Sequence, residues 1–511
     1  MLNRRTIGYA VLAAWLSVVA LHAHREYRQP EGVRLAAGAR SLAPGAHWFV
    51  IRMGDMPIGV AQSALDTLPD GFAFRDAITL DVPALGRLHR SYARTRIELD
   101  PMLELRTFRF ALDSEIGRFA VSGTADGDSA VMITMEAGGG PQTTRMRVSG
   151  GLLLDAALTL RMAASGALHA GNTFTAQIFD PSSMSERAVE VSVEARETII
   201  VSDSAAWIDG RWVATVMDTV PVWRVQQRFG GVTITSWVDE DGQVVRAHSP
   251  LGFTIERAYY ELAQQEWRNA ATADHVGGYG ALIEGTAISS NVDLRDVEAR
   301  PSLLVRLGGV DLAGFDLDGG RQRLHGDTLV ITREPDPRGA SAAGSTYALP
   351  YQRDGPAAAE LEATPLIQSD DPRIAAVARQ AVGGSVDAAE VAQRLNDWVY
   401  RSLRKELTLS VPSALQVLDA RQGDCNEHTV LYLALARALG LPARAAVGLV
   451  HIRGSFYYHA WPEVWLGEWV AVDPTLGQYP ADASHLRFIV GGLARQVELI
   501  RLIGRLRLEV L

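Results

Sequence analysis

Three residues in the C-terminal third of the chain have the types needed for covalent catalysis: Cys425, His459 and Asp473. A cysteine thiolate is a strong nucleophile, a histidine beside it takes up and returns its proton, and an aspartate orients that histidine. Cys425 is the only cysteine in the sequence, so no intramolecular disulfide competes for it. The three residues therefore predict a nucleophile, a base and an orienting group for chemistry at an acyl carbon.

The sequence around Cys425 predicts that this residue begins a buried helix. Asp424 is a suitable N-cap, and the apolar run 430–439 ends at Gly440 and Pro442, which stop a helix and prevent its restart. Free backbone N–H groups and the helix dipole favour an anion at the first turn. The backbone N–H of Cys425 is thus the expected donor to a reacting oxyanion.

A predicted hairpin positions His459 and Asp473. Strand-like segments 456–465 and 468–473 flank a turn at 466–467. Antiparallel partners have a constant index sum, so we expect the register to set His459 opposite Asp473 or close to it. Each residue taken alone would more often be structural, and Asp473 also suits the start of a turn.

Other side chains near these motifs are candidates for the oxyanion site and the pocket wall; they are Gln416, Gln422, His428 and Trp461. A zinc site made of Cys425, His428, His451 and His459 is the alternative to a triad. A Cys-x-x-His pair at the start of one helix lacks the matching second pair of a structural zinc site. We therefore expect neither a metal nor a cofactor.

Four segments, 423–425, 437–444, 459–465 and 469–475, resemble the core of the transglutaminase-like superfamily in order and spacing. The cysteine and histidine are 34 positions apart (459 − 425), and the histidine and aspartate are 14 apart (473 − 459). The resemblance covers roughly residues 361–490 and none of the N-terminal half. It implies a papain-like α+β core that acts on amide or acyl bonds.

The N-terminal half has a different pattern. From Gly45 to about Arg268, short runs alternate apolar and polar residues between turn signals, which is typical of an antiparallel meander. The clearest hairpin turn is 239–242. The pattern is similar to that of lipoprotein-carrier-type half barrels, so we expect this region to bind a lipid, a glycan or a protein. The predicted fold class is α+β, with a large antiparallel all-β region before the transglutaminase-like domain.

The length of 511 residues requires more than one hydrophobic core. We expect a membrane anchor or signal segment at 1–30, an antiparallel β domain at 31–270, a small β-rich connecting domain and linker at 271–360, and a catalytic domain at 361–511. The alternating tail 502–511 predicts a closing strand.

Charge and the N-terminal residues suggest where the protein acts. The net charge of −10 shows no footprint for nucleic acid. Arg4 and Arg5 precede the apolar run 7–23, which predicts a single uncleaved span in a bacterial inner membrane with the body in the periplasm. The alternative is a signal peptide, for which 18–20 is a mediocre cleavage site.

Three functions agree with these features. A peptidase or amidase acting on a peptide or protein comes first, because hydrolysis of a thioester needs no second substrate site. A transamidase forms the same thioester and transfers the acyl group to an amine. A non-catalytic binding or scaffold protein with a relic domain is the third, and it predicts an ordinary, slow thiol.

Overall fold

The computed structural model describes residues 31–511 except 85–86, 115–116, 128, 138–140, 149–152, 181–184, 250–251, 273–286, 338–346, 407–412, 492–497, 500 and 503–504. The predicted anchor at 1–30 lies outside the described residues. Within those that are described, no helix combines the length and apolar character needed to cross a membrane.

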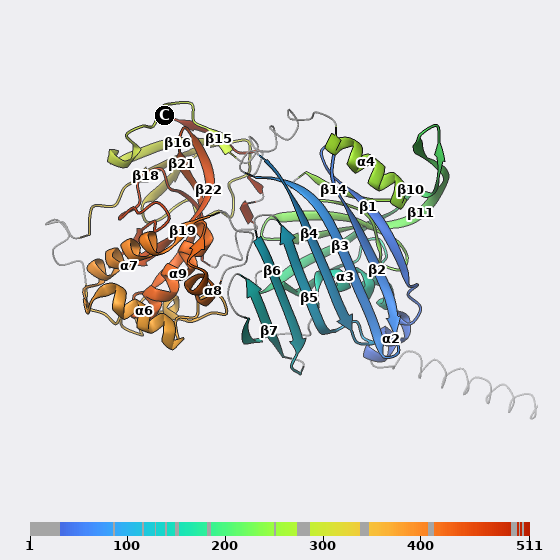
Figure 1. Cartoon of the computed structure of the whole chain (residues 1–511), viewed down its shortest axis with the longest axis horizontal. Helices are drawn as coiled ribbons and strands as arrows, with labels where there is room; N and C mark the ends of the chain where they lie inside the picture. Colours follow the sequence, from blue (N-terminus) through green and yellow to red (C-terminus); the bar gives the residue numbers. More distant parts are fainter. Residues whose placement is uncertain are drawn as a thin grey trace, which may run out of the picture.

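The N-terminal part is a single 14-stranded antiparallel sheet (Figure 1), which confirms the large antiparallel region expected from the sequence. Its first and last strands, β1 and β14, pair in the middle of the sheet, and β8 and β9 form the edges. The strands are β1 (Gly45–Met53), β2 (Met56–Leu68), β3 (Gly71–Ala84), β4 (Arg87–Leu99), β5 (Leu105–Ser114), β6 (Gly117–Ala125), β7 (Ala130–Ala137), β8 (Gln142–Arg147), β9 (Thr173–Asp180), β10 (Ser185–Ile208), β11 (Arg211–Phe229), β12 (Val232–Val238), β13 (Val244–His248) and β14 (Phe253–Ala258).

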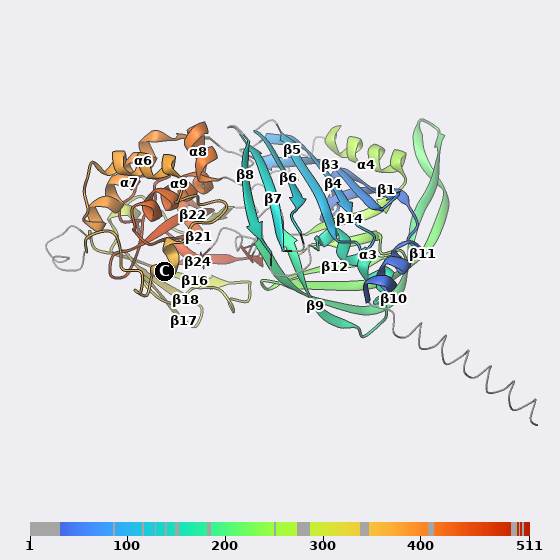
Figure 2. The same cartoon turned by 90° about the horizontal axis from the view of Figure 1, so that it is seen from below.

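This sheet curves around helix α3 (Asp155–Ser165), as Figure 2 shows. The sheet has two wings, β1–β8 and β9–β14, which meet where β1 pairs with β14. Leu158 and Leu160 of α3 belong to one apolar cluster with residues from both wings. The predicted turn at 239–242 joins β12 to β13. Its Gly242 has a φ of +77°, and a Cβ there would lie 2.3 Å from the Thr159 carbonyl oxygen of α3. A glycine is therefore required for this hairpin to pack on the helix.

The C-terminal part packs helices against a five-stranded sheet with the path β15-β22-β21-β24, in which β23 pairs with β22. The helices are α6 (Pro372–Val382), α7 (Ala388–Ser402), α8 (Ala414–Ala420) and α9 (Cys425–Ala438). The strands are β15 (Ala287–Ser289), β21 (Ala443–Ile452), β22 (Ser455–Trp465), β23 (Trp469–Ala471) and β24 (Leu486–Gly491). Ten consecutive residues of α9, from Glu427 to Ala436, are buried, as the apolar run predicted.

Residues from the predicted connecting domain share sheets with the C-terminal part. Strand β15 pairs with β22, and β16 (Ser302–Gly308) pairs with β25 (Arg507–Val510). The pairing of β25 confirms a closing strand for residues 507–510 of the tail, whereas Leu502 and Arg505, also expected in that strand, lie in turns. Gln322 of β17 (Gln322–His325) also exchanges two hydrogen bonds with the Arg487 backbone of β24, at 2.6 and 2.9 Å. Described residues of 287–334 are therefore part of the structure that supports β22 and β24.

The remaining elements are helices α2 (Glu31–Ala39) and α4 (Tyr260–Thr272), strand β18 (Thr328–Thr332), the short strands β19 (Arg404–Lys405) and β20 (Gln422–Gly423), and the 3-10 turns Val297–Ala299 and Ala358–Leu361. Strands β19 and β20 pair in parallel just before α9. The two parts of the chain also touch: the Ser413 hydroxyl, at the start of α8, donates a hydrogen bond to Gln142 Oε1 of β8 at 2.9 Å.

Candidate active site

Cys425 is the first residue of α9, and Asp424 is its N-cap, as predicted. The Asp424 side chain accepts a hydrogen bond from the Asn426 N–H at 3.0 Å, and Glu427 accepts one from the Asp424 N–H at 3.0 Å. These two hydrogen bonds form a capping box, which gives partners to backbone N–H groups at the start of the helix. Cys425 is partly exposed, and its place in the first turn puts the thiol near the positive end of a buried helix dipole.

His459 lies on β22 and contacts Asp473. Its Nε2 is 2.8 Å from Asp473 Oδ2, and Cys425 is close enough to the ring to help raise the pKa of His459. Because Nε2 faces the aspartate, Nδ1 is the nitrogen left for the thiol. The structure thus brings together all three residues proposed for the triad, in the order nucleophile, base and orienting carboxylate.

The register expected for Asp473 is wrong, although the predicted proximity is right. In the β22–β23 pair, Trp465 opposes Trp469 and Glu463 opposes Ala471, and the pairing ends there. Continued to residue 473, this register would place the aspartate opposite Trp461 and not His459. The chain instead leaves the strand, and Asp473 Oδ1 accepts hydrogen bonds from the backbone N–H groups of two turn residues, Thr475 at 2.7 Å and Leu476 at 3.0 Å.

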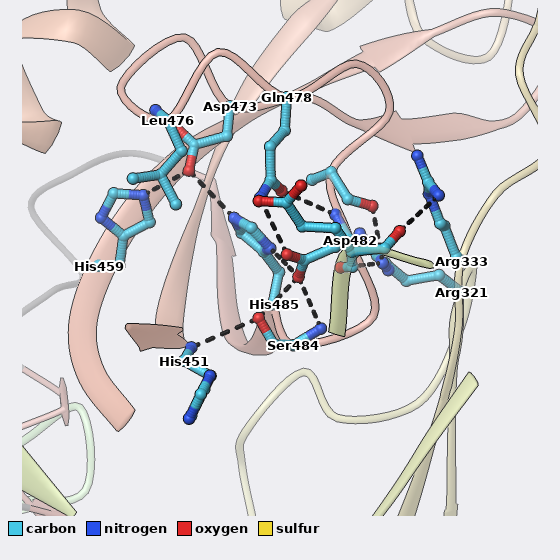
Figure 3. A network of polar contacts seen from close by, with 12 residues as sticks. Arg321, Arg333, His451, His459, Asp473, Leu476, Gln478, Asp482, Ser484 and His485 are labelled. Carbon is cyan, nitrogen blue, oxygen red and sulfur yellow. Dashed lines mark hydrogen bonds and ion pairs between the residues drawn. The ribbon is translucent and has the colours of Figure 1, made fainter. Parts of the chain in front are cut away.

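A second histidine, which the sequence analysis missed, contacts the same aspartate. His485 Nε2 is 3.0 Å from Asp473 Oδ2, and its Nδ1 is 3.1 Å from Asp482 Oδ1. Asp482 Oδ1 also accepts a hydrogen bond from the Ser484 hydroxyl at 2.6 Å (Figure 3). The sequence offered one clue to His485: the segment 482–485, which contains an aspartate, a serine and this histidine, directly precedes an apolar strand.

The shared carboxylate controls the charge state of both imidazoles. Burial disfavours the charged form of His459, but Asp473 and Cys425 outweigh it and raise its pKa to about 9. Burial likewise opposes charge on His485, and the two carboxylates that it contacts raise its pKa to about 9. Burial alone would raise the pKa of Asp473, but the two histidines hold it far below the usual range. The network therefore stabilises an ionised aspartate between two imidazolium groups.

Trp461 and His428 are both buried beside the proposed triad. The Trp461 ring stacks on His459, with centroids 6.1 Å apart and planes 22° apart, and meets His485 edge-on at 5.1 Å. His428 Nδ1 is 2.6 Å from the Asp424 carbonyl oxygen. Burial lowers the pKa of His428, which favours the neutral ring. Trp461 thus forms part of the wall that keeps water from His459.

The two glutamine candidates have different surroundings. Gln416 is buried, its Oε1 accepts a hydrogen bond from the Ser413 N–H at 3.3 Å, and its Nε2 has no partner among the described residues. Gln422 Oε1 accepts a hydrogen bond from the exposed Arg404 side chain at 2.5 Å. Gln416 therefore retains a free buried donor, whereas the acceptor of Gln422 is used outside the triad.

The zinc alternative finds no support in the placement of its ligands. In the described part of the chain, one group of side chains could hold a metal, and it consists of His459, Asp473 and His485. Cys425, His428 and His451 are not members of that group. The contacts from the two imidazoles to Asp473, at 2.8 and 3.0 Å, are ordinary hydrogen bonds.

A buried ion network supports the strands that carry the site. Glu463 of β22 accepts hydrogen bonds from Arg444 at 2.7 and 2.9 Å and from Arg487 at 3.1 Å. Arg444 also stacks on Trp469, with its guanidinium carbon 4.0 Å from the ring centre. Arg487 is 3% exposed, so Glu463 is needed to compensate its buried positive charge. The network ties β21, β22 and β24 together next to His459 and His485.

A second buried pair holds the loop between Asp473 and His485. Arg321 donates to the carbonyl oxygens of Ala481 at 3.2 Å and Asp482 at 2.6 Å, and it lies 3.4 Å from Glu334. Glu334 in turn accepts a hydrogen bond from the Ala471 N–H at 3.1 Å. Residues from the predicted connecting domain therefore position the loop that carries Asp482.

Comparison with known proteins agrees with this site. Residues 375–474 match the family model of the transglutaminase-like superfamily, so this part of the chain is transglutaminase-like, as its motifs indicated. No curated protein matches the sequence.

Three solved structures have partial likenesses to the chain. A proposed cysteine protease from Cytophaga hutchinsonii is 16% identical, covering 43% of this chain and 81% of its own, with a TM-score of 0.27. A beta-barrel-like protein of a domain of unknown function from Brucella abortus is 13% identical, covering 42% and 95%, with a TM-score of 0.30. The periplasmic domain of TgpA from Pseudomonas aeruginosa is 17% identical, covering 35% and 74%, with a TM-score of 0.24.

Replacing His485 by asparagine should lower kcat/KM about tenfold, because a charged hydrogen bond to Asp473 worth roughly 1.5 kcal/mol is lost. The change also removes a positive charge close to His459, so the His459 imidazolium becomes easier to form and the alkaline limit of activity moves to higher pH. The matched control is His325→Asn, at an exposed position of β17. A loss of rate with an unshifted pH profile would assign His485 a purely structural role.

Proposed function

We propose that the protein is a cysteine-nucleophile enzyme that cleaves amide or acyl bonds through a thioester, with peptidase or amidase activity as the first choice. The observation that carries this proposal is the His459 ring, which is hydrogen-bonded to Asp473 and is close enough to Cys425 for the thiol to help raise its pKa. The transglutaminase-like match over 375–474 supports the same chemistry. We assign the C-terminal domain to the papain-like α+β class on this basis.

The reaction follows from the geometry. The Cys425 thiolate attacks the substrate carbonyl carbon, and the backbone N–H of Cys425 at the helix terminus donates to the developing oxyanion. His459 passes its proton to the leaving amine, which departs as the thioester forms. Water then attacks the thioester while His459 accepts its proton, and the acid is released with the Cys425 thiolate and the His459 imidazolium restored. Asp473 and His485 remain charged throughout and keep His459 in place.

Transamidation is the second candidate, because an amine in place of water would use the same thioester. To separate the two, the full chain is mixed with p-nitrophenyl acetate and glycinamide, and the products are identified by mass spectrometry. Free acetate indicates hydrolysis, and acetylglycinamide indicates transfer. The enzyme proposal requires a nitrophenol burst and an acetyl adduct on Cys425, and both must be absent from Cys425→Ala. If the thiol reacts with iodoacetamide but no adduct forms, the proposal fails.

Activity should be constant from about neutral pH upward and fall near pH 9. The raised pKa of His459, about 9, means that the imidazolium persists below that pH and is lost above it. Its proton is needed by the leaving amine, so kcat/KM must decline as the imidazolium disappears. Because His485 shares Asp473, the measured limit belongs to the coupled pair. A decline that begins near pH 6.5 would contradict the proposed ion network.

The N-terminal residues support a proposal for where the protein is located in the cell. We propose that 1–30 anchor the chain in a bacterial inner membrane, with the body and its peptide or protein substrate in the periplasm. The support is the apolar run 7–23 behind Arg4 and Arg5. A fusion of 1–30 to alkaline phosphatase should be active in cells and pellet with membranes, whereas release into the soluble fraction would indicate a cleaved signal.

A further inference from the structure

The curved N-terminal sheet encloses a cavity that none of the catalytic residues lines. Its volume is about 510 Å³, within the range of roughly 300–1,000 Å³ that is typical of small-molecule sites. Residues of β1 to β6, β9 to β14 and α3 contribute to the wall. Five aromatic side chains face it: Phe49, Phe74, Phe108, Phe110 and Phe179. Walls of this kind suit a hydrocarbon chain.

Charged groups also line the cavity, and acids outnumber bases. Asp76, Asp155 and Asp180 are present with a single arginine, Arg187. Arg187 lies 3.4 Å from Asp180 and places its guanidinium 4.1 Å from the centre of the Phe229 ring. Arg187 is paired with Asp180 and also opposes the rise in the pKa of Asp155, so this one arginine faces two of the three carboxylates. The excess of carboxylates favours a ligand group that is positively charged or donates hydrogen bonds.

Asp155, at the start of α3, is the clearest contact point for such a group. Its side chain is solvent-accessible, yet the surrounding protein is dense enough that burial raises its pKa. Asp155 is one of the residues that line the cavity, so its carboxyl group can be reached from inside the curved sheet. No described residue donates a hydrogen bond to it. Asp76, by contrast, is hydrogen-bonded by Ser63, its direct partner across the β2–β3 pair.

We propose that this cavity binds a single-chain amphiphile, with its hydrocarbon chain between the aromatic walls and a hydrogen-bond-donating head, an amine or a hydroxyl, at Asp155. The sequence suggested a lipid, a glycan or a protein as the ligand of the β region. The proposal selects one of these chemical classes, a single-chain amphiphile, and assigns it to one pocket. It is independent of the activity proposed for Cys425, because it uses only residues of the sheet and α3.

The test uses the full chain and probes of equal length with different heads. Displacement of the fluorescent probe 1-N-phenylnaphthylamine is measured with dodecylamine, dodecanol and dodecanoate below their micelle concentrations. We expect saturable 1:1 binding, with dodecylamine and dodecanol at least tenfold tighter than dodecanoate, whose anionic head meets the carboxylates. Asp155→Asn should remove most of this difference, because the amide no longer repels the anion.

Variants that fill the cavity locate the site. Ala156→Trp on α3 and Ala247→Trp on β13 both place an indole in the cavity and should abolish binding. Ala120→Trp is the matched control, because Ala120 lies on the opposite face of β6 from Val121, which lines the cavity. Thermal melts show whether each variant is folded. The test needs only one of the two cavity-filling variants to be folded. Unchanged affinity in a folded filled variant, or equal affinity for all three heads, would overturn the proposal.

Discussion

Cys425→Ala should abolish catalysis, with a fall in kcat of about 10⁴–10⁶-fold, while the melting temperature stays near that of the wild type. In the proposed mechanism the Cys425 thiol forms the covalent intermediate, and its side chain is only partly buried at the margin of a core cluster, so its loss should cost little stability. His459→Ala should cause a comparable loss, and the double variant little more, because the two residues act as one unit.

Thiol labelling makes this prediction measurable without a known substrate. Cys425 is the only cysteine, so the rate of iodoacetamide alkylation reports a single site. We expect fast alkylation at pH 6 in the wild type and a reduction of at least tenfold in His459→Ala, because the imidazolium that stabilises the thiolate is missing. His325→Ala, at an exposed histidine of β17, should be unchanged. A slow thiol in both wild type and His459→Ala would favour the binding-protein alternative.

Glu463→Ala should destabilise the C-terminal part by about 3–5 kcal/mol. Glu463 is 1% exposed and pairs with two arginines, of which Arg487 is also buried. Removing the carboxylate leaves the Arg487 charge in a low-dielectric environment with only backbone carbonyls as partners. The double variant Glu463→Met, Arg487→Met should recover part of the loss, because no unpaired buried charge remains there.

Urea unfolding gives the measurement, and an exposed ion pair gives the control. Glu509→Ala breaks a pair with Arg306 in which both side chains are about half exposed, so the expected loss is about 0–1 kcal/mol. A decrease of less than 1 kcal/mol in the free energy of unfolding of Glu463→Ala would mean that water hydrates the Arg487 guanidinium once its partner is removed. Such a result would also weaken the role assigned to this network in positioning β22 and β24.

Local features of the fold were predictable because they depend on neighbours in the chain. The strands around 47–52, 94–99 and 130–135 follow from alternation of period two, and the 239–242 turn follows from its residue types. Asp424 was identifiable as a cap because capping involves residues within one turn. The three residues proposed as a triad could be selected for a related reason, since each lies in a short motif with family spacing.

Only the tertiary structure decided how distant segments meet. The proximity of Asp473 to His459 was expected from strand register, but it comes from a turn that starts two residues beyond the last strand pair. His485 could not be assigned from the sequence, because its contact with Asp473 depends on how the 473–485 loop folds back, and Arg321 and Glu334 from another sheet hold that loop. The cavity likewise exists only where the two wings of the sheet close around α3. Patterns of residues determine elements, whereas packing between elements determines which side chains share one aspartate.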